Sequence, residues 1–342
     1  MIRRAEPARR IGSLGWTALS LAAGALAAGA LAAANRLIAM TAGETYSVLG
    51  GEEGRFAWQH GGRQYDIRYV VRGRGAPLLL VHGIYAGASS FEYRRVFEPL
   101  SEQFRVYALD LLGFGLSARP ALRYAPALYI QLLQDFSRQV MGAADHPVTV
   151  VASTLSGAYA VRAAAEQPDL YARLVLIEPV GLETRAAARA NPLRQAACGA
   201  LRSPVLGQAL YNLVASRASI RYFLRRQVYA NPAAVTPALV DYYHTAAHQP
   251  GARYAPASFI SGLLDTPIAT AYAGLTQPIL LIWGARARLT PLDQARGFRQ
   301  RNPHAEIRVF DCGALPQDEM PEEFAREVGA WLRRGAPSRR QR

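Results

Sequence analysis

Short apolar runs alternate with stretches of helical periodicity along most of this chain. The apolar runs are typical of buried strands, which we place at residues 67–71, 77–81, 106–110, 148–151, 174–177, 279–283 and 307–310. The amphipathic stretches predict helices at residues 91–104, 127–141, 156–167, 292–301 and 322–333. Strands that alternate with helices form a mainly parallel sheet covered on both faces, so the pattern predicts an α/β fold.

The alternation stops between about residues 180 and 265, where the sequence has helical patterns and no clear strand. We interpret this segment as a helical cap over the carboxyl ends of the strands, where open α/β sheets bind ligands. Prolines break its helical patterns at Pro192, Pro204, Pro232 and Pro237. Six aromatic residues either wall off an apolar ligand or form the cap's own core: Tyr211, Tyr222, Phe223, Tyr229, Tyr242 and Tyr243.

An uncharged run rich in Ala, Leu and Gly covers residues 11–34 and has no polar face. As a helix, its 24 residues would reach about 36 Å, enough to cross a hydrocarbon core of about 30 Å. We therefore expect a membrane anchor, and the four arginines before the run place the globular domain outside the cytoplasm. A cleaved signal is the alternative, since Ala32, Ala33 and Ala34 satisfy the A-x-A rule and cleavage would give a secreted protein.

These patterns divide the chain into five parts. Residues 1–10 are a basic N-terminus, and residues 11–34 are the anchor or signal segment. A polar linker at 35–54 precedes the globular domain at 55–334, whose cap covers about 180–265, and a basic tail follows at 335–342. At 342 residues the chain is long enough for one large α/β domain with such a cap.

The formal net charge of +14 raises the question of a nucleic-acid partner. All 39 basic residues are arginines, they are scattered, and no nucleic-acid-binding motif accompanies them, so we expect no nucleic acid. The lack of lysine excludes a Schiff-base lysine and a Ser–Lys dyad. Cys198 and Cys312 lack the spacing of metal ligands, and no metal, nucleotide or flavin motif is present. We therefore expect no metal and no cofactor, while the oligomeric state stays open.

Residues 148–160 (VTVVASTLSGAYA) place a strand, a turn of small residues and a helix in immediate succession. In this context the nucleophile elbow, G-x-S-x-G, holds a catalytic serine. Aligned on that pattern, Thr154 takes the nucleophile's place, and Ala152 and Ser156 take the small flanking positions. The sequence predicts a catalytic turn without the usual catalyst.

From about residue 63 to 334 the chain resembles the α/β-hydrolase superfamily in four signatures. The segment LLLVHG that ends at Gly83 resembles the oxyanion loop, and DLLGFGLS from Asp110 resembles the D-x-x-G-x-G-x-S loop. The elbow is the third signature. The fourth is a pair of segments, PILLIWGARARLTP and CGALPQDEMPEEF, which resemble those that carry the triad acid and histidine. The resemblance implies an α/β-hydrolase sheet with a helical cap.

Carried across residue by residue, the resemblance puts Thr154 at the nucleophile, Ala287 at the acid and Ala314 at the histidine. A hydroxyl attacks a carbonyl only when a base takes its proton, and the acid orients that base. This chain therefore lacks an intact triad. The resemblance also implies that the backbone N–H groups of Ile84 and Leu155 form the oxyanion hole, beside His82 and Gly83.

Other ionisable residues offer weaker substitutes. His244 and His248 are four residues apart and share a helix face, a spacing that suits a metal, although no third ligand or intervening glutamate accompanies them. A solvated or core pair is the alternative. Glu178 ends a strand where some members of the superfamily keep a substitute acid, or else is structural. We expect Asp110 and Asp311, which also end strands, to hydrogen-bond to nearby loops.

Three hypotheses follow for the function. The first is a membrane-anchored, non-hydrolytic protein that binds an apolar or acyl-type ligand or a protein partner. The second is a hydrolase of ester, lactone, amide or C–C bonds that acts through an unusual site. The third is a triad-disabled variant of an ordinary serine hydrolase. An aspartate nucleophile is absent at Thr154, which favours serine-type ancestry, and whether the chain is an enzyme stays open at this point.

Overall fold

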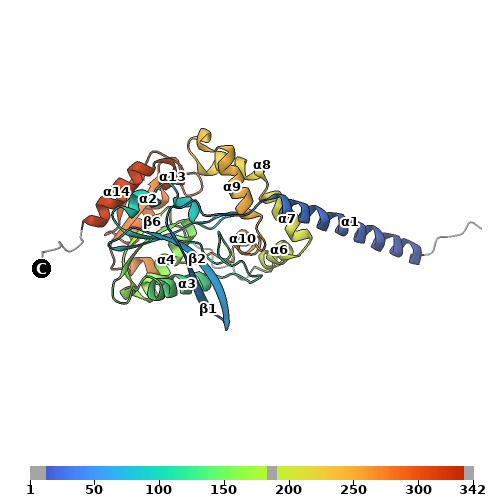
Figure 1. The fold of residues 1–342 in the computed structure, drawn as a ribbon, viewed down its shortest axis with the longest axis horizontal. Coiled ribbons are helices and arrows are strands. Elements are labelled where there is room, and N and C mark those ends of the chain that lie inside the picture. The colour runs from blue at the N-terminus through green and yellow to red at the C-terminus, as the bar shows by residue number, and fades with distance from the viewer. Residues whose placement is uncertain (1–12, 183–190, 335–342) are drawn as a thin grey trace, which may run out of the picture.

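The computed structural model of the protein describes residues 13–182 and 191–334, and an eight-stranded sheet forms its centre (Figure 1). The expected segments 1–10 and 335–342 lie outside the described residues, as does part of the cap. The strands are β1 (Glu52–His60), β2 (Arg63–Arg72), β3 (Pro77–Val81), β4 (Arg105–Leu109), β5 (Val148–Ser153), β6 (Tyr171–Ile177), β7 (Ile279–Gly284) and β8 (Glu306–Phe310). Their order is β1-β2-β4-β3-β5-β6-β7-β8.

The six strands from β3 to β8 pair in parallel, which confirms the predicted α/β architecture. Strand β2 pairs antiparallel with both β4 and β1. Strand β1 was not predicted, although its buried Phe56 and Trp58 flank the exposed Ala57 in the alternation of a strand. The hairpin turns at Gly61 and Gly62, which have φ angles of 58° and 73°. Two successive positive φ angles are the signature of a type I′ turn, which suits the twist of a two-residue hairpin.

Helices cover both faces of the sheet, because successive residues of a buried strand point to opposite sides. Leu79 and Val81 pack with helices α3 and α4, whereas Leu78 and Leu80 pack with α2 and α14. The helices are α1 (Ser13–Thr41), α2 (Phe97–Ser101), α3 (Pro126–Gln139), α4 (Thr154–Glu166), α6 (Pro192–Arg202), α7 (Leu206–Val214), α8 (Arg217–Phe223), α9 (Pro237–Ala247), α10 (Tyr254–Ile260), α11 (Ala269–Ala273), α12 (Gln294–Arg301), α13 (Pro316–Glu319) and α14 (Pro321–Arg333). Short helical turns are η1 (Ser90–Tyr93), η2 (Pro168–Leu170), η3 (Leu224–Val228, a π-helix) and η4 (Pro232–Ala234).

The helix expected over residues 91–104 is wrong. The chain there forms the 3₁₀ turn η1, further turns and the short helix α2. The N–H groups of Arg94 and Val96 bond to carbonyls three residues back, which is the tighter 3₁₀ spacing. These turns direct both Glu92 and Tyr93 into the interior, where a regular helix would expose one of a neighbouring pair.

Within its described residues the cap consists of helices α6 to α10 joined by turns, and it contains no strand. It lies over the carboxyl ends of the strands, because Phe91, Ala314 and Leu315, which follow β3 and β8, pack into the same apolar cluster as helices α8 and α9. Gly87 has a φ of 79° and approaches the Tyr243 carbonyl of α9 so closely that a Cβ would lie 2.5 Å from it. The cap and the loop after β3 are therefore in direct contact.

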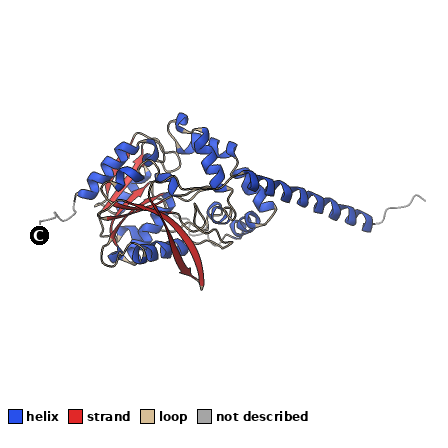
Figure 2. Ribbon diagram, viewed as in Figure 1, coloured by secondary structure: helices blue, strands red, loops and turns tan. Residues whose placement is uncertain are grey.

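Helix α1 projects away from the globular domain as a long single rod, and its C-terminal end rests on α7 (Figures 1 and 2). Residues 35–41, expected in a linker, are its last turns. The side chain of Asn35 is the buried contact point, while Leu26, Leu37 and Met40 on the same helix are exposed. Within the described residues, α1 is the one helix long and apolar enough to cross a membrane.

Candidate functional site

Thr154 occupies a strained turn between strand β5 and helix α4. Its φ is 48°, in the left-handed region, which costs a non-glycine residue about 1–3 kcal/mol and disfavours β-branched side chains in particular. Ser153 and Leu155 on either side are buried, whereas Thr154 itself is half-buried. The tight elbow therefore persists and presents the threonine side chain outward from the carboxyl edge of the sheet.

The loop after β3 lies directly against this elbow. A Cβ built on Gly83 would lie 3.0 Å from the Thr154 Oγ1, so only a hydrogen fits there without displacement. The Ser156 hydroxyl donates to the His82 carbonyl at 2.6 Å and fastens the two segments together. Within the described residues, no acceptor is found for the N–H of Ile84 or Leu155. An oxyanion hole formed by these two groups stays a prediction.

His82 is held in a structural role. Its Nδ1 lies 2.7 Å from the Gly83 carbonyl, and its Nε2 accepts the Leu111 N–H at 3.1 Å. A ring nitrogen that accepts a hydrogen bond carries no proton, so the Nδ1 must be the donor and the ring is neutral. Both nitrogens are thus occupied, and His82 has no lone pair free to take a proton from Thr154.

Ala287, at the position where the sequence predicts the acid, is buried. Ala287 follows β7, and its N–H closes a turn onto the Gly284 carbonyl at 3.2 Å. Nearby Glu178, at the end of β6, accepts the Gly284 N–H at 3.0 Å and the Thr290 hydroxyl. Burial raises the pKa of Glu178 to about 7. Glu178 therefore binds the loop that would carry an acid, rather than an imidazole.

Ala314, at the position where the sequence predicts the histidine, is buried as well. Ala314 is buried in the apolar cluster with cap residues, and its N–H donates to the Val228 carbonyl at 2.7 Å. Next to it, the Gly313 N–H donates to Glu319, which also accepts the Ala230 N–H of the cap. Hydrogen bonds of Gly313 and Ala314 thus connect the loop after β8 to the cap, directly and through Glu319.

A buried carboxylate that the sequence analysis missed lies beside the elbow. Glu92 is 1% exposed and accepts hydrogen bonds from the Gly83 N–H at 3.0 Å and the Tyr85 hydroxyl at 2.9 Å. Its other oxygen accepts from the Gln317 amide at 2.8 Å, and the same amide reaches the Ser153 hydroxyl. No motif signalled it, since Glu92 stands in the sequence among serines and arginines. The network joins the loop after β3, the elbow and the segment that contains Gln317.

The cap aromatics divide into two groups. Tyr211, Tyr229 and Tyr243 are buried, and Tyr242 stacks on Phe91 with 3.6 Å between ring centroids. The Tyr243 hydroxyl lies 3.4 Å from that of Tyr85, and burial raises the pKa of both phenols. Tyr222 and Phe223 point outward instead, with 65% and 39% of their surfaces exposed. Those two residues do not wall off a ligand.

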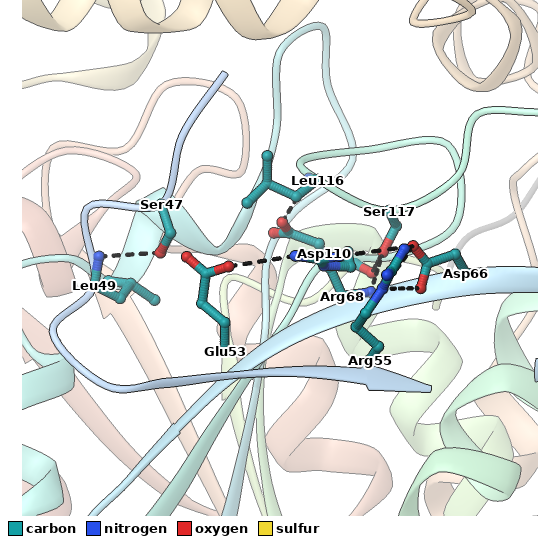
Figure 3. Close-up of polar contacts among 9 residues, drawn as sticks. All are labelled: Ser47, Leu49, Glu53, Arg55, Asp66, Arg68, Asp110, Leu116 and Ser117. Atoms are coloured by element: carbon teal, nitrogen blue, oxygen red, sulfur yellow. Dashed lines mark hydrogen bonds and ion pairs between the residues drawn. The ribbon is translucent and has the colours of Figure 1, made fainter. Parts of the chain in front are cut away.

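Asp110 connects loops, as the sequence predicts (Figure 3). Its carboxylate accepts the N–H groups of Ser90 and Leu116, both at 2.7 Å, and its carbonyl accepts the Ser117 hydroxyl. The cavity beside it, about 10 Å³, has room for one water molecule at most. Asp311 ends β8 and forms an exposed ion pair with Arg286. Neither aspartate touches the elbow.

The two cap histidines form a stacked pair on α9, with ring centroids 4.1 Å apart. Burial, together with the charge of Arg217 and the neighbouring imidazole, lowers the pKa of His244 to about 4. Within the described part of the chain, no group of three metal-ligating side chains includes them. The pair packs inside the cap, away from Thr154.

Comparisons with known proteins agree with this architecture. The model of the alpha/beta hydrolase family matches residues 78–327. A 2-hydroxy-6-oxo-6-(2'-aminophenyl)hexa-2,4-dienoic acid hydrolase of Metapseudomonas resinovorans is 26% identical over 279 residues, which cover 79% of this chain and 89% of that protein.

Two solved structures share the fold. A serine hydrolase involved in carbazole degradation has a TM-score of 0.66 at 23% identity, with 82% of this chain and 99% of that one covered. A membrane phospholipase A described as a bacterial virulence factor has a TM-score of 0.65 at 24% identity, with 94% and 98% covered. With its sheet, its elbow and its match over most of its length, this chain belongs to the alpha/beta hydrolase family.

Proposed function

We propose that this protein is a membrane-anchored, triad-deficient member of its family that binds an apolar or acyl-type ligand without hydrolysing it. One observation carries the proposal: Ala287 and Ala314, at the positions where the sequence predicts the acid and the histidine, are both buried, while Thr154 keeps the strained φ of an elbow. Loss of a triad typically costs about 10⁶ in turnover. What remains is a scaffold suited to binding.

The absence of a base supports a non-hydrolytic role. All six histidines are described; His82 has both nitrogens engaged, and His244 and His248 pack in the cap. His60 stacks on Trp58 in the first hairpin. A threonine hydroxyl without an imidazole stays protonated near neutral pH, so it can donate a hydrogen bond but does not attack a carbonyl.

The surroundings of Thr154 favour a ligand with an oxygen at one end and an apolar body. The N–H of Leu155 lies in the first turn of α4, where the helix supplies no acceptor for it. A carbonyl or carboxylate oxygen could accept from that N–H and from Ile84. Phe91, Tyr243 and Leu315 belong to a buried apolar cluster at the same end of the sheet, against which an apolar body could pack.

The contacts of α1 join the proposed anchor to the cap. Asn35 follows the candidate cleavage site directly, and its side-chain amide donates to the Val205 carbonyl at 2.9 Å and accepts from Asn212 at 3.0 Å. Further on, Thr245 donates to the Ala42 carbonyl. A 29-residue helix would reach about 44 Å, so it can cross a bilayer of about 30 Å and still contact the cap. The globular domain then lies outside the cytoplasm.

Ester hydrolysis tests the catalytic part of the proposal. The full chain, purified in detergent, is assayed with p-nitrophenyl butyrate and octanoate beside Thr154→Ala and the triple variant Thr154→Ser, Ala287→Asp, Ala314→His. We expect the chain and Thr154→Ala to have the same background rate. Turnover that Thr154→Ala abolishes would overturn the proposal. Turnover gained only by the triple variant indicates a hydrolase pocket from which the catalyst was lost.

Titration with dodecanoate tests the binding part. Gly83→Ala places a methyl group 3.0 Å from the Thr154 Oγ1, in the space where the ligand oxygen would lie. We expect it to weaken binding by about tenfold or more. Gly199→Ala is the matched control, because a Cβ there meets nothing within 4 Å. Equal affinity in all three proteins would argue against a site at the elbow.

Glu92 favours a second candidate, a hydrolase with an unusual base. A Cβ on Gly83 would lie 3.0 Å from the Thr154 Oγ1 and 3.4 Å from the Glu92 Oε2, so both groups border the same small space. This candidate predicts turnover that disappears in Thr154→Ala and also in Glu92→Gln, which keeps the shape of the side chain but cannot take a proton.

A further inference from the structure

Helix α7 has an apolar face that nothing in the described structure covers. Leu206, Leu210, Leu213 and Val214 recur at the spacing of one helix face and are 55%, 38%, 69% and 47% exposed. The opposite face is buried through Tyr211. An amphipathic helix of a globular protein normally turns such a face toward the core. In α7 the apolar face is exposed instead, and the side that contains Tyr211 packs against the rest of the cap.

The next helix continues this surface and adds positive charge. Tyr222 and Phe223 at the end of α8 are exposed, and Arg221 and Arg225 beside them are exposed as well. The ion pairs found among the described residues include neither arginine. Aromatic and aliphatic side chains bordered by arginines are typical of surfaces that lie at the headgroup level of a bilayer.

The position of α1 fixes where this surface lies. Asn35 bonds to the Val205 carbonyl and to Asn212, so α7 sits at the height of Asn35 along α1. That residue follows directly on the apolar run of residues 11–34. Figure 1 shows α7 at the base of α1, with α6 and α8 on the same end of the domain. If residues 11–34 cross the bilayer, α1 leaves the hydrocarbon core near Asn35, and α7 lies beside α1 at that point.

We infer that the exposed faces of α7 and α8 form a second membrane contact, which lies in the surface of an anionic bilayer beside the anchor. The inference rests on the proposed anchoring of α1. The apolar side chains of α7 enter the region between headgroups and acyl chains, and Arg221 of α8 and Arg225 of η3 pair with lipid phosphates. The cap, which covers the elbow, is then held against the lipid from which an acyl-type ligand would come.

A bilayer fits this surface better than a second copy of the chain does. In a two-fold dimer the same patch meets itself, so Arg221 and Arg225 would face the same two arginines of the second copy. The neighbouring acid Asp241 already pairs with Arg217 at 2.5 Å. Anionic headgroups supply the missing negative charge without any complementary protein surface.

Depth-dependent quenching tests the inference on the full chain in nanodiscs that contain phosphatidylglycerol. A fluorophore is attached at Leu213→Cys or, as the matched control, at Val309→Cys, which is 49% exposed on β8. The native cysteines, 4% and 2% exposed, give little background, which the unmutated chain measures. We expect lipids that carry a doxyl group high on the acyl chain to quench the Leu213 position at least twofold more than Val309.

Each other outcome overturns the inference in a recognisable way. Equal quenching at both positions in a chain that resists carbonate extraction would remove the cap contact and leave the anchor intact. Release of the chain by carbonate would disprove both the anchor and this inference. The non-hydrolytic part of the proposed function would still be tested separately by the esterase assay. Excimer emission from pyrene at Leu213→Cys without quenching would indicate a second copy on this face. With the fluorophore at Leu210→Cys, a second change, Leu213→Gln, should reduce the quenching by doxyl lipids. The control change Val309→Gln should leave this quenching unaltered.

Discussion

The Glu92 Oε2 accepts the backbone N–H of Gly83 at 3.0 Å, which connects a buried carboxylate directly to the loop that faces the elbow. The same oxygen accepts the Tyr85 hydroxyl. The carboxylate thus sets the path of the chain between β3 and η1, on one side of the space that Thr154 borders. A side chain in this position controls the shape of the site even if it performs no chemistry.

Replacing Glu92 by leucine should destabilise the protein strongly. The Gly83 N–H and the Tyr85 hydroxyl would lose their acceptor in the interior, and each unpaired buried group costs about 1–3 kcal/mol. Glu92→Gln should cost much less, because its amide oxygen can still accept from both donors. Denaturant unfolding in detergent measures these differences. The control is Glu98→Leu, which removes an exposed ion pair between Glu98 of α2 and Arg72. It should change the free energy of unfolding by less than about 0.5 kcal/mol.

Replacing Thr154 by glycine should stabilise the protein. Glycine adopts a φ of 48° without the strain of about 1–3 kcal/mol that a β-branched residue bears there. The greater freedom of glycine in the unfolded chain offsets part of this gain, so we expect a net increase of about 1 kcal/mol. Thr149→Gly, within strand β5, is the matched control and should destabilise. A loss of stability in Thr154→Gly would show that contacts of the threonine side chain outweigh the strain.

Replacing Asn35 by alanine should loosen the contact between α1 and the cap. The Val205 carbonyl and the Asn212 amide would both lose a partner, at a local cost of about 1–3 kcal/mol. Hydrogen exchange of the amides in residues 36–41 should accelerate, because these last turns of α1 then open more often. Arg36→Ala, on the exposed side of the same turn, should leave the exchange rates unchanged. Equal protection in both variants would contradict a docked helix end.

The sequence predicted the sheet well because buried parallel strands are continuous apolar runs. It failed at residues 91–104, where tertiary contacts of Glu92 and Tyr93 replace a helix with tight turns. It also missed β1, where Phe56 and Trp58 lie between charged and polar residues at both ends of the strand, which lower its overall hydrophobicity. Local pattern does not record which buried polar groups will contact one another, and such contacts decided the structure of residues 91–104.

The site was predictable only where a motif has a fixed position. Thr154, Ala287 and Ala314 fall at the turn and loops that the motifs indicate. Glu92 and Gln317 are 225 positions apart and belong to no motif, so only the fold brings them together. Glu178 ends a strand, but its bonds to Gly284 and Thr290 depend on the packing of β6 against β7.

The pKa of Glu178 makes the stability of the fold depend on pH. Burial raises this pKa to about 7, above its ordinary value near 4.5, so the folded protein holds the proton more tightly than the unfolded chain does. The stabilisation by the protonated carboxyl is therefore complete below about pH 4.5 and is lost as the pH rises through about 7. The loss amounts to about 3 kcal/mol at pH 8 for this group alone.

Glu178→Gln should remove this dependence, because glutamine resembles the protonated acid. Its amide oxygen can accept the Gly284 N–H, and its NH₂ group can donate to the Thr290 oxygen. We expect the variant to match the parent chain at pH 5 and to exceed it by about 2–3 kcal/mol at pH 8 in urea unfolding. Glu166→Gln, on an exposed i,i+4 ion pair, should follow the parent at both pH values. If Glu178→Gln is instead less stable at pH 8, the ionised carboxylate is the form that the loop after β7 requires, and Glu178 would retain the charge of an acid that once oriented a histidine.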